Sequence, residues 1–518
     1  MMTDLQLANV LEGHQVTASR TETVDVVIIG SGCGGAVVGK ELARAGKSVL
    51  MLERGGLSLP QRGDFDQRED DMFARLDGGR GLDTSENGQA ALTYGRTVGG
   101  ASVHYWADTW RAPEDRLKKW NLEHHQLADL LPWFERIEKD LHAHPAHELK
   151  RNAMNRLYVK GAEAAGIEWE PVTQARDDRC IGSGYCMQGC AYDGKQSQLV
   201  TSIPEALSLG LKLFADCEVR SIDVENGRAV GVTAHFLERR TGRPSGHTLT
   251  VKAKKVVVAA GGFNSAPLLM RSRIPDPSGQ LGKNLQFNPC PQLFALFDED
   301  VAMWRGIPAA VGTLEYRLHR FDGARYVEGG YLLHPNQLPP ATLAALLPGF
   351  GASHRQLMEK AHRIGSAIAW IDDANSGSVT LDPEGEPLFR WELSGLDELT
   401  VRDAFKKQAT VLLHAGAREV IVPDARGTRL SDLKELKVLD TVDLRPGSVT
   451  FATPHPAGMC RMGADPKTSV VDVNHECHAV KGLFVCDPSV FPTAVSVDPS
   501  ETIMAFSYVA AARMLERW

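Results

Sequence analysis

Short apolar runs alternate with one amphipathic run near the N-terminus. Residues 24–29, VDVVII, are almost continuously β-branched, which is typical of a strand buried on both faces of a parallel sheet. A glycine-rich turn follows, and then AVVGKELARAG has the apolar spacing of a helix that ends at Gly46. The next run, SVLMLE, predicts a second strand. Strand, turn, helix and strand together fill about thirty residues, the size of one βαβ unit.

The pattern changes twice along the rest of the chain. Residues 114–165 have a helical character, and residues 251–262 return to strand and glycine turn. From about residue 291 to 440, short strands such as SGSVTLD mix with helix-like stretches such as LTVRDAFKKQATVLLHAGA, and the strand-and-turn pattern resumes after 450. This order predicts a nucleotide domain built from segments 20–115, 180–290 and 450–518, and a substrate domain built from 116–179 and 291–449.

Composition narrows the class of protein. A chain of 518 residues is long enough for two domains. With 43% hydrophobic residues and a net charge of −8, neither nucleic acid nor an acidic membrane surface is an expected partner, and no apolar run reaches the length of a membrane span. Nine thinly spread cysteines and an N-terminus without signal-peptide regions predict a cytoplasmic protein. Export to the periplasm with a signal-bearing partner stays open.

Three glycines stand in the first predicted turn. Gly30, Gly32 and Gly35 form G-x-G-x-x-G directly after a strand and at the start of a helix. Such glycines let the backbone approach a pyrophosphate, which then meets the unpaired N–H groups of the helix N-terminus. Glu53 closes the second strand 23 residues after Gly30, where an acid can bind a ribose 2′-hydroxyl. The unit predicts a dinucleotide site for FAD or NAD.

Two later motifs add to this site. The run YGRTVGGASVHYWA contains Gly99 and Gly100, against which a planar ring can lie. His455, in ATPHPAGMCRMGADP, is a candidate general base because imidazole titrates near neutrality; a structural loop histidine is the alternative. A last helix begins near Ser500, and its positive end can face the pyrimidine edge of a flavin.

These motifs, together with GKNLQFNP and LFVCDPSVFPTAVSVDPSETIMAF, resemble in order and spacing the glucose–methanol–choline (GMC) oxidoreductases. The resemblance runs from about residue 22 to the C-terminus and is loose over 296–440. It implies an α/β protein: a Rossmann-like FAD-binding domain with an inserted α+β substrate-binding domain that contains an antiparallel sheet. It also implies oxidation of an alcohol CH–OH to a carbonyl, with hydride passing to flavin N5 and electrons then passing to a cytochrome, another carrier or O2. A lyase, a photoenzyme and a non-catalytic flavoprotein on the same scaffold are the alternatives.

The resemblance assigns roles residue by residue. His455 takes the position of the family's catalytic base, and Asp498 takes a position where the family usually has His or Asn. An aspartate beside an anionic reduced flavin costs Coulomb energy unless it is protonated or paired with an imidazolium. We expect Asp498 to be the partner of His455; Ser496 or Ser500 is the alternative. The residues that the resemblance assigns to the cofactor are Gly30, Gly32, Gly35, Glu53, Arg96, Gly99, Gly100, Ser102, His104, Val219, Asp487 and Pro499.

The role of His104 stays open on the sequence. It stands where some members of the family, including pyranose and choline oxidases, attach FAD covalently through histidine. Other members with a similar run bind the flavin without a bond. Geometry decides between the two.

The run CIGSGYCMQGC holds Cys180, Cys186 and Cys190 in a C-x5-C-x3-C spacing. It is similar to a segment of bacterial FAD-dependent glucose and sorbitol dehydrogenase subunits, in which a three-iron–four-sulfur cluster relays electrons from flavin to a cytochrome. Packed free thiols are the alternative. Zinc is disfavoured because no nearby His or Cys completes a fourth ligand.

The substrate is the least defined feature. An apolar, proline-broken stretch over 332–351 can line a cavity for a hydrophobic or cyclic alcohol, or form an ordinary hairpin and core helix. Tyr105, Trp106 and Trp110 can equally stack a sugar ring. The oligomeric state cannot be read from the pattern.

Overall fold

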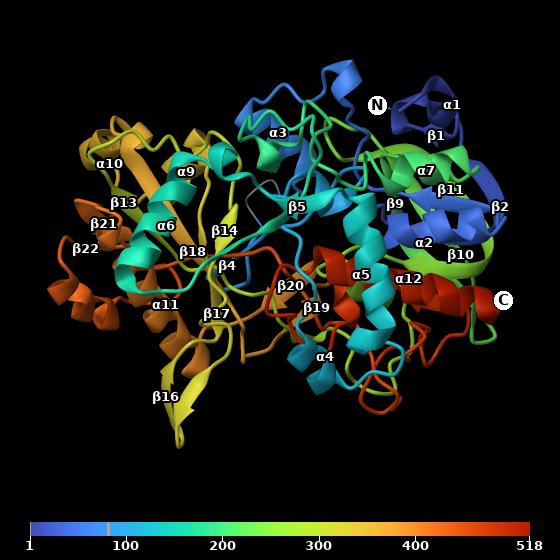
Figure 1. Cartoon of the computed structure of the whole chain (residues 1–518). Coiled ribbons are helices and arrows are strands. Elements are labelled where there is room, and N and C mark those ends of the chain that lie inside the picture. The colour runs from blue at the N-terminus through green and yellow to red at the C-terminus, as the bar shows by residue number, and fades with distance from the viewer. Residues whose placement is uncertain (1, 80–82) are drawn as a thin grey trace.

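The computed structural model describes residues 2–79 and 83–518. Two bodies lie side by side: one is built around a large twisted sheet that carries both chain ends, and the other around a smaller sheet with helices α6, α10 and α11 (Figure 1). Among the described residues, no helix combines the length and the apolar character needed to cross a membrane.

The larger body is organised by an eight-stranded sheet in which β2 is central. Within β2 (Arg20–Ile29), Val26 pairs in parallel with Val49 on one side and with Lys255 on the other. Because both faces of this part of β2 are covered, residues 26–28 are fully buried, as the β-branched run predicts. The path of the sheet is β1 (Val10–Leu11), β8 (Lys212–Phe214), β3 (Val49–Leu52), β2, β11 (Pro244–Val258), β10 (Arg228–Leu237) and β9 (Cys217–Glu225), with β24 (Leu483–Val485) beside β11. Strand β10 is antiparallel to both of its neighbours, β9 and β11, and the remaining pairs are parallel.

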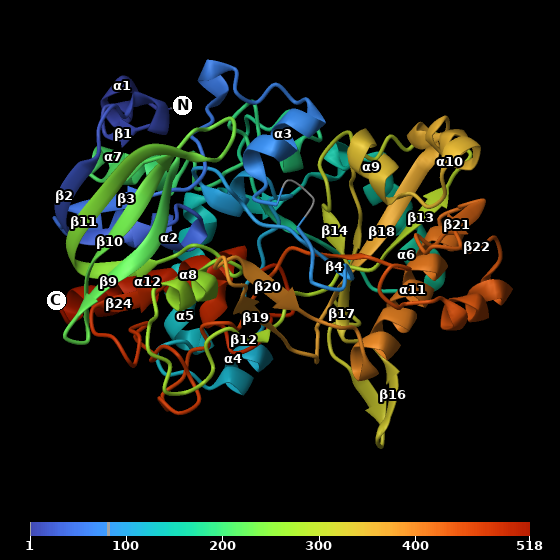
Figure 2. The ribbon, with the colours of Figure 1, turned by 180° about the vertical axis from the view of Figure 1, so that it is seen from behind.

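Helix α2 (Cys33–Arg44) lies between α12 (Ser500–Glu516) and α7 (Ser202–Ser208) in this body. Its approach to β24 is close, because a Cβ atom on Gly34 would lie 1.8 Å from the carbonyl oxygen of Cys486. The start of α2 therefore packs against a residue from near the other end of the chain, and Figure 2 shows α2, in blue, beside α12, in red.

The smaller body contains a five-stranded antiparallel sheet, as expected. Its order is β17 (Tyr331–Pro335), β18 (Ile364–Ile371), β13 (Gln292–Leu296), β21 (Glu419–Ile421) and β22 (Arg429–Leu430). Every residue of β18 is buried, since α11 (Gly395–His414) packs on the sheet and α6 (Ala153–Ala165) packs on α11.

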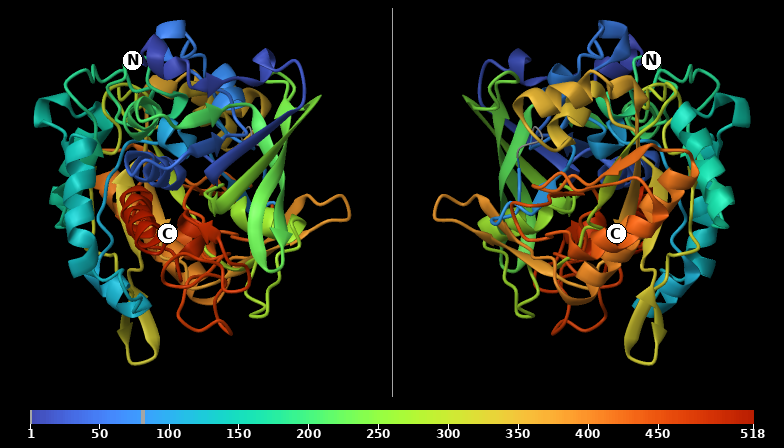
Figure 3. Two further views of the ribbon diagram at one scale, coloured as in Figure 1. Left: turned by 90° about the vertical axis from the view of Figure 1, so that its right-hand side faces the viewer. Right: turned by 90° about the vertical axis from the view of Figure 1, so that its left-hand side faces the viewer.

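A three-stranded sheet crosses the expected domain boundary at residue 290. Its strands are β12 (Lys283–Leu285), β19 (Gly377–Leu381) and β20 (Pro387–Arg390), so β12 pairs with a strand from the expected substrate segment. The β15–β16 and β19–β20 hairpins project in different directions (Figure 3).

The remaining helices are α1 (Asp4–Leu7), α3 (Glu69–Leu76), α4 (Glu114–Trp120), α5 (Leu127–Asp140), α8 (Ser265–Arg271), α9 (Pro340–Leu346) and α10 (Gly351–Met358). The remaining strands are β4 (Ala90–Leu92), β5 (Ala143–Pro145), β6 (Glu170–Pro171), β7 (Thr173–Ala175), β14 (Val311–Gly312), β15 (Arg320–Asp322), β16 (Arg325–Glu328) and β23 (Phe451–Thr453). The parallel pair β4–β23 leads the chain directly toward His455.

Candidate active site

The first glycine turn has a backbone that only glycine can adopt. Gly30 follows β2 with φ 99°, and a Cβ atom there would lie 2.2 Å from the carbonyl oxygen of Ala259. A Cβ atom on Gly35 would lie 2.1 Å from the Gly30 carbonyl oxygen. Gly32 is the N-cap of α2, so the first N–H groups of the helix are directed into the turn. This cradle fits a pyrophosphate.

Glu53 follows β3 and lies beside this turn. Its carboxylate accepts hydrogen bonds from the Ser31 N–H (3.1 Å), the Ser31 hydroxyl (2.7 Å) and the Gly55 N–H (2.8 Å). Burial raises the pKa of Glu53, and these donors oppose the rise. The Gly99 N–H donates to the Ser31 hydroxyl at 3.0 Å, so Ser31 links Glu53 to the second glycine turn.

The other residues expected at the cofactor occupy several elements. Asp487 follows β24 and accepts hydrogen bonds from the N–H groups of Gly261 (3.2 Å) and Ser489 (2.9 Å), which ties together two loops at the same sheet edge as Gly30. Ser102 donates to the Gly99 carbonyl at 2.6 Å. The three others are Arg96, which donates its N–H to the Leu76 carbonyl; Val219, in β9; and Pro499, the N-cap of α12. Their contacts with FAD stay a prediction.

His104 is buried at the end of the second glycine turn, and its Nε2 atom has no hydrogen-bond partner. Burial lowers the pKa of His104 to about 3, with the Lys195 ammonium contributing, so the imidazole is neutral. Lys195 donates to the carbonyl oxygens of Val103 (2.6 Å) and Tyr105 (3.0 Å), on either side of His104. A neutral, unpaired Nε2 is compatible with a covalent flavin bond and with simple packing.

The two residues expected to be catalytic are brought together by segments that follow β23 and precede α12. His455 Nε2 lies 3.5 Å from Asp498 Oδ1, and each side chain is 11% exposed. Burial raises the pKa of Asp498, but the hydrogen bond and charge of His455 outweigh burial and hold it below its ordinary value. Asp498 therefore points toward His455, and its role as the catalytic partner stays a prediction.

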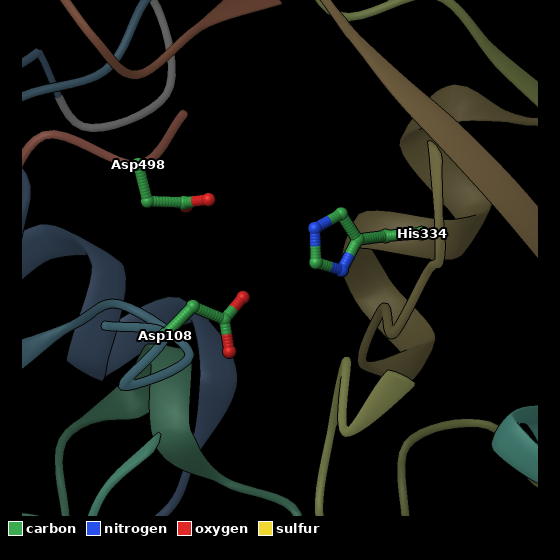
Figure 4. A group of neighbouring side chains, drawn as sticks. All are labelled: Asp108, His334 and Asp498. Atoms are coloured by element: carbon green, nitrogen blue, oxygen red, sulfur yellow. The ribbon is translucent and has the colours of Figure 1, made fainter. Parts of the chain in front are cut away.

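Two further buried residues face this pair, and neither was singled out from the sequence. Asp108 lies after the second glycine turn and is 1% exposed; His334 lies in β17 and is fully buried. Polar atoms of Asp108, His334 and Asp498 all lie within 4.8 Å of one another, and Figure 4 shows the three side chains pointing toward a common space. Burial, together with the Asp498 carboxylate, raises the pKa of Asp108 well above its usual range. Burial lowers the pKa of His334 to about 4, against the pull of Asp498.

Three tryptophans wall the same space. The ring of Trp370, in β18, lies 5.2 Å from that of His455 and 5.9 Å from that of Trp106. Trp110 meets the His334 ring edge-on at 6.1 Å. All three indole N–H groups are buried without a hydrogen-bond partner. The three rings therefore form an apolar lining with unpaired N–H donors, as in sites that bind a partly polar organic molecule.

The three loop cysteines surround one small cavity. Cys180, Cys186 and Cys190 are half-buried free thiols, and with Lys195 they line a cavity of about 30 Å³. Burial raises the pKa of Cys186 to about 12, opposed by the Lys195 ammonium. The three cysteines thus line one cavity, next to the backbone that carries Tyr105.

Two patterns in the sequence contain the residues that were missed. WADTW sets Asp108 between two tryptophans just after the second glycine turn, and LLHPNQ sets His334 alone in an apolar strand. A charged or titratable residue inside such runs is a usable signal for a site, since buried polar groups need partners.

Comparisons with known proteins agree with this geometry. Models of the GMC oxidoreductase family match residues 24–290 and 373–507. The chain is 30% identical to an uncharacterised GMC-type oxidoreductase of Mycobacterium tuberculosis over 98% of this chain and 78% of that protein. It is 26% identical to a long-chain-alcohol oxidase of Arabidopsis thaliana over 98% of this chain and 69% of that protein. The crystal structure of a formate oxidase shares the fold, with a TM-score of 0.71 and 15% identity over 97% of this chain and 99% of the other.

The fold and the site define an FAD-dependent oxidoreductase, with a dinucleotide cradle leading to a buried histidine–carboxylate pair. The chain belongs to the GMC oxidoreductase family. The fold class expected from the sequence is confirmed.

Proposed function

We propose that this enzyme oxidises an alcohol to a carbonyl with His455 as the general base. The observation that carries the proposal is the buried contact of His455 Nε2 with the Asp498 carboxylate, 3.5 Å away. A long-chain-alcohol oxidase among the similar proteins supports an alcohol as the substrate class.

His455, Asp498 and two tryptophans have separate roles in the proposed reaction. His455 Nε2 takes the proton of the substrate hydroxyl, and the Asp498 carboxylate stabilises the imidazolium that results. Bound FAD would supply the acceptor for the hydrogen on the carbinol carbon as hydride, so that loss of one proton and one hydride would leave a carbonyl. Trp106 and Trp370 exclude water from the space beside His455.

The glycine turns at Gly30–Gly32 and Gly99–Gly100 would hold the pyrophosphate of FAD, with Glu53 at the ribose. His104 is the residue we expect to carry any covalent bond to the flavin. Acid precipitation tests this: flavin that stays with the protein pellet in the wild type and moves to the supernatant in His104→Ala assigns the bond to His104.

We further propose that Cys180, Cys186 and Cys190 would hold an iron–sulfur cluster, which would supply an electron relay to an external carrier such as a cytochrome. Three cysteines line one cavity beside the Tyr105 backbone, and the buried Lys195 offers a positive charge against thiolates. Iron analysis tests this: about three irons per flavin, lost in Cys186→Ser, supports the cluster. A preparation that contains flavin but no iron would show that the three cysteines are free thiols. O2 or a soluble carrier would then be the electron acceptor.

Anaerobic mixing with alcohols tests the function itself. We expect substrate to bleach the flavin in the dark in the wild type, and His455→Ala to slow bleaching by about 10² to 10⁴, the usual share of a general base. A lyase would turn substrate over without bleaching, and a photoenzyme would require light.

A further inference from the structure

Next to the His455–Asp498 pair lies a set of buried polar atoms that the proposed reaction does not use. Asp108 Oδ2 and Asp498 Oδ2 have no hydrogen-bond partner, and neither ring nitrogen of His334 makes a bond of normal geometry. The three residues are 1%, 7% and 0% exposed, respectively. Leaving a buried polar group unpaired is costly because the group has lost its bonds to water, so several such groups facing one space indicate a polar group of a ligand.

The spacing of the three residues suits one oxygen atom. One polar atom of each residue lies within 4.8 Å of a polar atom of the other two, so a point exists within about 2.8 Å of all three atoms, which is a normal O–H···O hydrogen-bond length. Burial and the nearby Asp498 carboxylate raise the pKa of Asp108 well above its usual range, which favours the protonated form that can donate as well as accept. A hydroxyl group, which also donates and accepts, matches this set.

The side chains of Asp108 and His334 are held in place by neighbouring residues. Asp108 accepts a hydrogen bond from Gln174 Nε2 at 2.9 Å, and Gln174 Nε2 is itself anchored on the Pro308 carbonyl at 2.8 Å. The His334 ring rests against β14, since a Cβ atom on Gly312 would lie 3.2 Å from its Cε1 atom. The pair is therefore fixed before any ligand arrives.

The set lies directly beside the atoms that would take the reacting hydroxyl. Asp498 belongs to both places: Oδ1 faces His455, and the carboxylate also lies within 4.8 Å of Asp108 and His334. Trp370 contacts the rings of both His455 and His334, at 5.2 and 6.1 Å. Two hydroxyls on neighbouring carbon atoms are close enough together to share one carboxylate, and the three tryptophans suit an apolar remainder of the substrate.

We propose that Asp108 and His334 form a subsite for a second hydroxyl of the substrate, so that the enzyme prefers alcohols with a hydroxyl on the adjacent carbon and an apolar chain. The inference rests on the proposed function, because it assumes that His455 receives the reacting hydroxyl.

The test compares 1,2-hexanediol with 1-hexanol on the holoenzyme, by anaerobic flavin reduction and by kcat/KM with an artificial acceptor. We expect the wild type to favour the diol at least tenfold. Asp108→Ala should lower the diol-to-alcohol ratio of kcat/KM at least tenfold, and Asp108→Asn, which keeps a hydrogen-bonding side chain, should restore most of the ratio. Asp403→Asn is the control. Asp403, in α11, accepts a hydrogen bond at 2.6 Å from Tyr331, which lies in β17 like His334, so this substitution also removes a charge that contacts β17. We expect it to leave the diol-to-alcohol ratio of kcat/KM unchanged.

Other outcomes overturn the subsite in distinguishable ways. The subsite is wrong and the proposed function is kept if both alcohols reduce the wild-type flavin but the diol-to-alcohol ratio of kcat/KM is near one. The same conclusion follows if this ratio is unchanged in Asp108→Ala. If neither alcohol nor any other bleaches the flavin, the proposed function falls and the subsite falls with it. One equivalent of a divalent cation per chain, lost in Asp108→Ala, would assign the three ligands to a metal instead.

Discussion

Gly32 and Gly100 face each other backbone to backbone: a Cβ atom on Gly100 would lie 2.7 Å from the Gly32 Cα atom. The first glycine turn and the second, far apart in the sequence, thus form one continuous backbone surface. Ser31 reinforces the contact, because its hydroxyl binds both Glu53 and the Gly99 N–H. A long cofactor can approach the backbone closely at both glycine turns along this surface.

The glycines of this surface should respond differently to alanine. A Cβ atom on Gly32 would meet only the Gly100 Cα at 3.8 Å, and the φ of Gly32 is −69°, so Gly32→Ala is tolerated by the protein alone. We expect Gly32→Ala to leave the Tm of the apoprotein nearly unchanged and to weaken FAD binding at least tenfold, because the methyl group enters the pyrophosphate space. Gly30→Ala should instead lower the Tm of the apoprotein itself, since its Cβ collides with Ala259. Equal FAD affinity in Gly32→Ala and wild type would contradict the cradle.

The charge of Asp498 should matter more than its shape. Asp498→Asn keeps a hydrogen-bond acceptor near His455 but loses the charge that stabilises the imidazolium. A charge-assisted hydrogen bond exceeds a neutral one by about 1 kcal/mol, so we expect kcat/KM to fall about five- to tenfold. Asp498→Leu should cost more. Steady-state kinetics on preparations of equal flavin content make the comparison, and unchanged rates in both variants would remove Asp498 from the mechanism.

Glu501 should make the protein less stable as pH rises. Both its carboxylate oxygens are buried without a partner, and burial, with Glu138 adding, raises its pKa from 4.5 to about 8. Between these values the folded state holds a proton that the unfolded state has released, so the free energy of unfolding falls from pH 4.5 to 8. At pH 7 the loss is about 3 kcal/mol.

Glu501→Gln removes this dependence. We expect the variant to be more stable than wild type at pH 7 to 8 and equal to it near pH 4.5, as measured by denaturant unfolding or Tm against pH. Glu516→Gln, on the exposed end of the same helix, is the control. Parallel pH curves for Glu501→Gln and wild type would show that Glu501 is ionised in the folded protein.

Lys195 should hold the cysteine loop to the turn that carries His104. Its ammonium is buried and bonds the carbonyls of Val103, Tyr105 and Cys186. Burial lowers the pKa of Lys195 to about 8, with Cys186 and Cys190 opposing. We expect Lys195→Met to lower flavin content and to speed alkylation of Cys186 at least tenfold, as followed by mass spectrometry. Alkylation at the wild-type rate would mean that the loop holds its position without Lys195.

The nucleotide-binding unit could be predicted in detail because its signals are local. The β-branched strand, the three glycines and Glu53 lie within one short stretch, and the period of the apolar positions and the turn chemistry specify each element. The expected helix α2 and strands β2 and β3 are found where the pattern places them. The pairing of β12 with β19 across the expected boundary at residue 290 has no such local signal, because it depends on contacts between distant segments.

By itself the sequence determined the family, the βαβ unit, the dinucleotide cradle and His455 as the candidate base, since short motifs carry them. Only the tertiary structure decided that Asp498 faces His455, and that Asp108 and His334, from different bodies of the fold, share one buried space with them. Such a meeting depends on how β17 packs against the segment after the second glycine turn. No local spacing encodes that packing, because burial and pairing over such separations arise only when the whole chain has folded.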